Sequence, residues 1–117
     1  MRNRLSLVAL AALCLAGCAS WTPEQLRARG QRADLQLSGD YRAGATCIAR
    51  IIDRQPGYSS EATWDESART AEVRGRGWGS ETAILVQVVD APAGPVARVY
   101  TRGDSQNVRT WFHSCAA

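Results

Sequence analysis

The amino-acid sequence predicts a two-layer α+β domain, in which an antiparallel sheet of about five strands carries helices on one face. Two observations support this prediction. Apolar residues recur with helical spacing in two segments, and several short segments alternate apolar and polar residues as half-buried strands do. The expected order of elements is β-α-β-β-β-β-α.

The first strand and the first helix are expected before residue 55. Leu35 and Leu37 alternate with polar residues, which indicates a short strand. A helix is predicted over residues 41–54 and ends before the breaker Pro56. Apolar residues that share one side of such a helix are Cys47, Ile48, Ile51 and Ile52.

Four further strands are expected after this helix. They cover residues 62–65, 71–74, 83–89 and 96–101. The segment 83–89 is apolar on both faces except at Gln87, which favours a central position in the sheet.

The last segment is predicted to be a helix that begins after Asp104 or Ser105 as cap. Its apolar residues have the spacing i, i+3, i+4 and i+7, and they are Val108, Trp111, Phe112 and Cys115. A final strand is the alternative, because tryptophan and phenylalanine are also frequent in strands.

Length and charge exclude several classes of protein. A chain of 117 residues is expected to form a single domain, and its 45% hydrophobic and 21% charged residues exclude intrinsic disorder. All 14 basic residues are arginines, against 11 acidic ones, for a net charge of +3. Removal of a leader with Arg2 and Arg4 leaves about +1, which argues against a nucleic-acid partner.

Residues 1–17 have the composition of a secretory leader. Arg2 and Arg4 precede an apolar run over residues 5–15, which is shorter than the roughly 20 residues of a membrane-spanning helix. The sequence therefore predicts export.

Leu15-Ala16-Gly17-Cys18 resembles the lipobox of bacterial lipoproteins. The resemblance implies cleavage before Cys18, a diacylglyceryl thioether on its sulfur and an N-acyl chain such as palmitate. Because Ala19 follows instead of aspartate, it also implies the periplasmic face of an outer membrane. The alternatives are an ordinary secreted protein and an uncleaved anchor. The body of the chain is similar in composition to small proteobacterial lipoproteins of unknown function.

Residues 18–33 are expected to form a lipidated tether before a domain over 34–117. Thr22, Pro23 and Gln25 match a capping box, and Trp21 and Leu26 match a hydrophobic staple, so a helix of two turns is one expectation. A disordered spacer is the other.

The cysteines predict one disulfide bond. Cys14 leaves with the leader and Cys18 carries lipid, so Cys47 and Cys115 remain in an oxidising compartment. The alternatives are a reactive thiol and a metal ligand. Since His113 is the only histidine, a zinc site would require carboxylates, and the sequence predicts neither a metal nor a cofactor.

One segment is a candidate contact surface. Arg74, Arg76 and Trp78 are expected to share a flexible, glycine-rich hairpin loop, and arginine and tryptophan are frequent at binding hot spots. In the alternative, the arginines keep the loop soluble and Trp78 folds back on the sheet. The expected partners are an envelope protein or an anionic envelope component, besides the membrane that holds the Cys18 lipid.

Three function classes remain open. The sequence favours a non-catalytic envelope lipoprotein that binds a partner or supports an assembly. An inhibitor-type module similar to the lysozyme inhibitors is the first alternative, although those are β-barrels and the helix at 41–54 counts against it. The second is a small hydrolase that uses His113 with Asp104 or Ser114.

Overall fold

The computed structural model of the protein describes residues 21–78 and 81–117. The predicted leader over residues 1–17 lies outside the described residues, as do Cys18, Ala19 and Ser20 of the predicted tether and Gly79 and Ser80 near the predicted loop. Within the described residues, no helix has both the length and the apolar composition needed to cross a bilayer. The elements follow in the order α2 (Pro23–Arg29), β1 (Gln31–Gln36), α3 (Tyr41–Arg54), β2 (Ser59–Asp65), β3 (Thr70–Arg76), β4 (Thr82–Val89), β5 (Val96–Thr101), α4 (Ser105–Trp111) and the 3-10 helix η1 (His113–Cys115).

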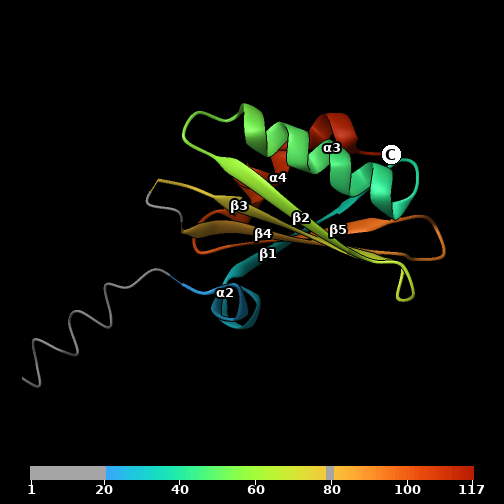
Figure 1. Ribbon diagram of the computed structural model, residues 1–117, viewed down its shortest axis with the longest axis horizontal. Coiled ribbons are helices and arrows are strands. Elements are labelled where there is room, and N and C mark those ends of the chain that lie inside the picture. The colour runs from blue at the N-terminus through green and yellow to red at the C-terminus, as the bar shows by residue number, and fades with distance from the viewer. Residues whose placement is uncertain (1–20, 79–80) are drawn as a thin grey trace, which may run out of the picture.

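The five strands form one antiparallel sheet in the order β1-β5-β4-β3-β2 (Figure 1). The predicted α+β class is therefore confirmed. β4 lies in the middle of the sheet, as its apolar residues predict. Ile84, Val86 and Val88 are buried in the core beneath α3, and Leu85 is buried on the opposite face.

α3 covers one face of the sheet, and its bounds agree with the predicted helix at 41–54. Asp40 caps its N-terminus, where the side-chain oxygen accepts the Ala43 N–H at 2.8 Å. Ile48 and Ile52 are fully buried against β3 and β4. Burial of these side chains, about 1.5–3 kcal/mol each, stabilises the helix on the sheet.

The C-terminal segment begins as a helix, so the alternative of a final strand is wrong. Asp104 caps α4 and accepts the Asn107 N–H at 3.1 Å. The expectation that one α-helix reaches Cys115 is also wrong, because α4 ends at Trp111 and Cys115 belongs to η1. Phe112, between the two, is completely buried.

A disulfide joins Cys47 of α3 to Cys115 of η1, with 5.9 Å between the two Cα atoms. The predicted pairing is thus present, although its second cysteine follows α4 instead of lying in it. The C-terminus also extends the sheet contacts of β1, since Leu37 forms a bridge with Ala116 and the Ala117 N–H donates to the Gln36 carbonyl at 3.0 Å.

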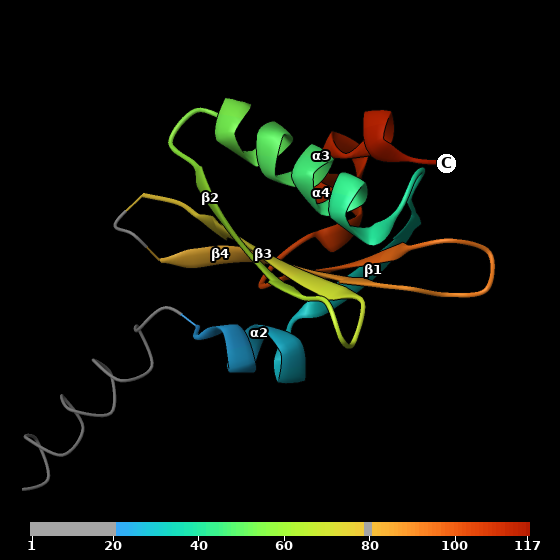
Figure 2. The same cartoon turned by 45° about the vertical axis from the view of Figure 1, so that its right-hand side comes forward.

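α2 is a third helix, and it lies on the sheet face opposite α3 and α4 (Figure 2). The capping box of Thr22 and Gln25 is present, with the Gln25 N–H donating to the Thr22 hydroxyl at 3.2 Å. Leu26 is 1% exposed and packs in a small cluster with Leu85 and Tyr100. The segment expected as either a short helix or a spacer is therefore an ordered part of the fold from residue 21 onward.

Candidate functional site

A groove with a volume of about 480 Å³ lies at the end of the sheet where β3 and β5 end and β4 begins. Its three aromatic residues come from different segments: Trp21 precedes α2, Tyr58 precedes β2 and Trp78 follows β3. The other lining residues are Leu26, Gly77, Glu81, Thr82, Ala83, Ile84, Thr101, Arg102, Gly103, Asp104, Asn107 and Val108. We call this cavity the sheet-end groove. Its size is within the range of ligand-binding cavities.

Trp21, at the edge of the groove, has cation–π contacts with two arginines. The guanidinium carbon of Arg29 lies 4.7 Å from the centre of the indole, and that of Arg102 lies 5.2 Å from it. Arg29 is the last residue of α2, and Arg102 directly follows β5. Their contacts with Trp21 therefore link the end of α2 to the end of β5. A cation over an aromatic face is attracted by the ring quadrupole. The arrangement holds both guanidinium groups beside Trp21, and Arg102 itself also lines the groove.

Trp78 is 83% exposed, so the alternative in which it folds back on the sheet is wrong. One edge of its indole lies against Gly57, in the turn between α3 and β2. A Cβ atom on Gly57 would lie 2.4 Å from the indole Nε1, and this glycine has a φ of +80°. Gly57 therefore serves two purposes, because it permits the turn and leaves room for the tryptophan.

The expectation that Arg74 and Arg76 lie in a loop with Trp78 is wrong. Both belong to β3, where Arg74 pairs with Leu85 and Arg76 with Thr82 of β4. Neither lines the sheet-end groove. The physical reason is Gly75, whose Cβ would lie 3.2 Å from the Ile84 Cβ and 3.3 Å from the Ile52 Cγ2. This glycine provides room for α3 on a strand and does not mark a loop.

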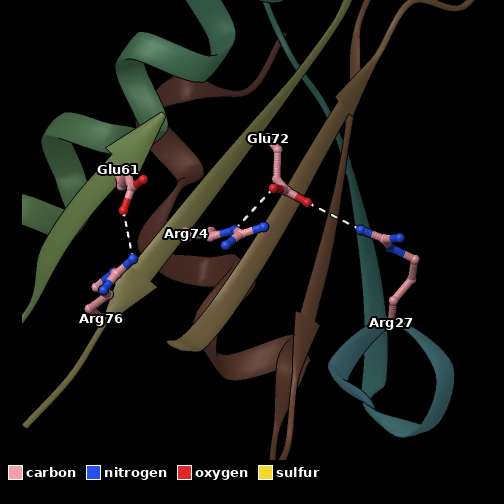
Figure 3. A network of polar contacts seen from close by, with 5 residues as sticks. All are labelled: Arg27, Glu61, Glu72, Arg74 and Arg76. Carbon is pink, nitrogen blue, oxygen red and sulfur yellow. Dashed lines mark hydrogen bonds and ion pairs between the residues drawn. The ribbon is translucent and has the colours of Figure 1, made fainter. Parts of the chain in front are cut away.

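Both arginines are engaged in ion pairs on the face of the sheet that carries α2 (Figure 3). The Arg74 Nε donates to the Glu72 Oε2 at 3.0 Å, and the Arg27 Nη2 of α2 donates to the Glu72 Oε1 at 3.2 Å. The Arg76 Nη2 donates to the Glu61 Oε2 of β2 at 2.8 Å. Glu72 thus links α2 to β3. Arg74 and Arg76, the two arginines predicted to contact a partner, instead form ion pairs within the domain.

The residues of the hydrolase hypothesis line three different cavities. His113 lies in a hollow beside Leu35 and Arg109, and Ser114 lies beside Cys47 and Arg50. Asp104 lines the sheet-end groove, and its carboxylate caps α4. The structure therefore does not bring these groups together.

Among residues 21–78 and 81–117, no group of three or more histidine, cysteine, aspartate or glutamate side chains is arranged to hold a metal ion.

Sequence reasoning assigned Trp78 to a contact surface and missed Trp21, Tyr58 and Arg102. Trp21 was interpreted as part of a helix staple, and it does pack on the Leu26 cluster. Its second role depends on Arg102, 81 positions later, and no local pattern connects residues so far apart.

Comparison with known proteins gives no family for the chain: no protein-family model, no curated protein and no solved structure matches it.

Proposed function

We propose that the protein is a non-catalytic binding domain of the bacterial envelope, anchored by lipid on Cys18, with the sheet-end groove as its contact surface. The observation that supports this proposal is the set of aromatic residues, Trp21, Tyr58 and Trp78, that line one groove together with Arg102. Aromatic and arginine side chains provide most of the binding energy at many protein surfaces. Trp78 is 83% exposed, so its contact with Gly57 leaves most of the indole free for a partner.

The compartment is supported by the disulfide between Cys47 and Cys115, because such bonds persist in oxidising environments. The lipobox-like segment ending at Cys18 supports the anchor, and Ala19 supports the periplasmic face of an outer membrane. Several acyl chains on one cysteine would hold the domain stably, whereas a single chain is marginal.

The anchor is tested by the mass of the mature N-terminus. We expect a first residue Cys18 that carries acyl chains, and we expect the Cys18→Ala variant of the full chain to remain unprocessed. A mature protein with an unmodified N-terminus would show that the lipidation proposal is wrong.

The contact surface is tested by photocrosslinking in cells that express the full chain. A photoreactive residue replaces Trp78 in one variant and Trp64 in the control. Trp64 is also exposed, at 48%, but it is the sixth residue of β2, whereas Ser59, at the beginning of that strand, pairs with Arg76 close to the groove. We expect an adduct from position 78 that is absent from position 64 and is weakened by Trp21→Ala. Equal adducts from both positions, or none from position 78, would contradict the proposed surface.

A further inference from the structure

We propose that the sheet-end groove faces the membrane and that its partner is the headgroup layer of an anionic bilayer. This inference rests on the proposed lipid anchor at Cys18 and names the chemistry that the same groove would contact. Three features of the chain support it: the distance that the backbone can span, the residues at the rim of the groove, and the position of the second exposed tryptophan.

The first feature is the reach of the backbone between the anchor and the groove. Trp21 is the third residue after Cys18, and an extended chain spans at most about 3.6 Å per residue, or about 11 Å in total. The headgroup region of one leaflet is roughly 5–8 Å thick. A lipid on Cys18 therefore keeps Trp21, and with it the edge of the groove, within or beside the headgroup layer.

The second feature is the chemistry of the rim. Trp21 is partly exposed and Trp78 is 83% exposed, and tryptophan is enriched at the boundary between the acyl chains and water. Arg29 and Arg102 both contact the Trp21 ring, and guanidinium groups bind phosphate oxygens in pairs of hydrogen bonds. Two indoles and two guanidinium groups at one end of the domain are suited to a membrane surface, where anionic headgroups cover apolar acyl chains.

Two carboxylates also line the groove, and they restrict where an anionic headgroup can bind. Asp104 accepts the Asn107 N–H at the start of α4, so its charge is directed to the helix cap. Glu81 lies at the beginning of β4. Contact with phosphate is therefore assigned to Arg29 and Arg102, whose guanidinium groups lie over the Trp21 ring.

The third feature is the position of Trp64, an exposed tryptophan far from the groove, which allows the groove to be compared with another part of the surface. It pairs with Ala71 of β3, while Ser59 at the other end of β2 pairs with Arg76. The five residue steps from Ser59 to Trp64 correspond to about 17 Å along the strand. With the groove against the membrane, Trp64 is expected to be in water.

The experiment uses the full-length, processed protein in vesicles of phosphatidylethanolamine and phosphatidylglycerol, with or without bromine on the acyl chains. Bromine quenches only those tryptophans that lie at the membrane. We expect strong quenching of the native protein, a loss of about half of it or more in the Trp21→Phe/Trp78→Phe variant, and no loss in the control variant Trp64→Phe. Thermal melting of each variant verifies that it is folded.

Replacing phosphatidylglycerol with phosphatidylcholine tests the role of the anionic headgroup. We expect weaker quenching of the native protein and little further change in an Arg29→Gln/Arg102→Gln variant. Equal quenching in both lipids would overturn the assignment to an anionic headgroup.

Flotation of the vesicles separates failure of this inference from failure of the proposed function. A protein that floats with the vesicles but shows no quenching of Trp21 and Trp78 overturns the membrane-facing groove and leaves the anchor intact. In that case an adduct of position 78 with a protein would identify the true partner of the groove. A processed protein that does not float overturns both.

Discussion

Two glycines determine the positions of side chains near the groove: Gly75 for the arginines of β3 and Gly57 for Trp78. Gly75 allows β3 to pass beneath Ile52 of α3, so the strand continues to Arg76. Gly57 leaves space for the indole of Trp78. In both cases a missing Cβ atom is required by a contact between segments, and glycine in the sequence is therefore not evidence of a flexible loop here.

A Gly75→Ala substitution is expected to destabilise the domain by about 1–3 kcal/mol, because the added methyl group enters a packed core. The matched control is Gly77→Ala, since a Cβ there would meet Tyr58 at 3.5 Å and Ala83 at 3.7 Å, which are ordinary contacts. Unfolding by urea measures both variants. Equal stability of the two would mean that α3 does not pack on Gly75 as described.

A Trp78→Ala substitution is expected to change the free energy of unfolding by less than about 0.5 kcal/mol, because the side chain is 83% exposed. The control is Phe112→Ala, where loss of a fully buried ring is expected to cost about 3–5 kcal/mol. The same urea experiment compares them. A large loss at position 78 would return this tryptophan to the core and remove it from the contact surface.

Apolar packing contributes more to the stability of α2 than its ion pair does. Its buried residue, Leu26, contacts the cluster of Leu85 and Tyr100, and its Arg27 pairs with Glu72. The Arg27 side chain is 45% exposed, so solvent screens its ion pair with Glu72. The helix has only 7 residues, too few to be stable in isolation, and its apolar contact with the sheet therefore accounts for most of its stability.

A Leu26→Ala substitution is accordingly expected to reduce the stability of the protein by about 2–3 kcal/mol. An Arg27→Ala substitution, which removes the ion pair with Glu72, is expected to cost less than about 1 kcal/mol. Urea unfolding, with hydrogen exchange of the α2 amides, measures both effects. If Leu26→Ala were no more costly than Arg27→Ala, α2 would be a loosely attached tether after all.

At the scale of the whole molecule, the disulfide bond links the middle of the chain to its C-terminal segment. The bond between Cys47 and Cys115 spans 68 residue positions and joins α3 to the C-terminal η1. A covalent loop of this length restricts the unfolded chain, which stabilises the folded state by about 4 kcal/mol in the chain-entropy account. For a domain of this size such a contribution is a large part of the total stability.

The Cys47→Ser/Cys115→Ser variant is therefore expected to melt more than about 10 °C below the native protein. Reduction of the native protein with dithiothreitol should produce a similar decrease, which controls for the effect of the serine side chains. Alkylation of the denatured, non-reduced protein should find both thiols protected. Two free thiols would contradict the bond.

Local patterns were sufficient for most of the elements. The bounds of α3 follow from its apolar spacing and from the break at Pro56, and the central position of β4 follows from its nearly continuous apolar run. The capping box at Thr22 is one of two expectations for its segment, and Asp104 is one of two candidate caps, because a cap needs only residues within one helical turn; the structure has both caps.

The residues of the candidate site come from segments that are far apart in the sequence, and no local sequence pattern shows that they lie together. Residue type and the nearby glycines point to Trp78, and the same glycines wrongly place Arg74 and Arg76 in a loop, because Gly75 lies within β3.

Periodicity acts over short range, so the sequence alone predicts the α+β class and the bounds of α3. The pairing of Cys47 with Cys115 follows instead from the number of cysteines that remain once Cys14 and Cys18 are assigned to the leader and the lipid. Tertiary structure decided that α2 covers the second face of the sheet, since this requires Leu85 and Tyr100 from two strands to meet Leu26. It also created the sheet-end groove, which Trp21, Tyr58 and Trp78 line from three segments that the pairing of β3, β4 and β5 brings to one end of the sheet.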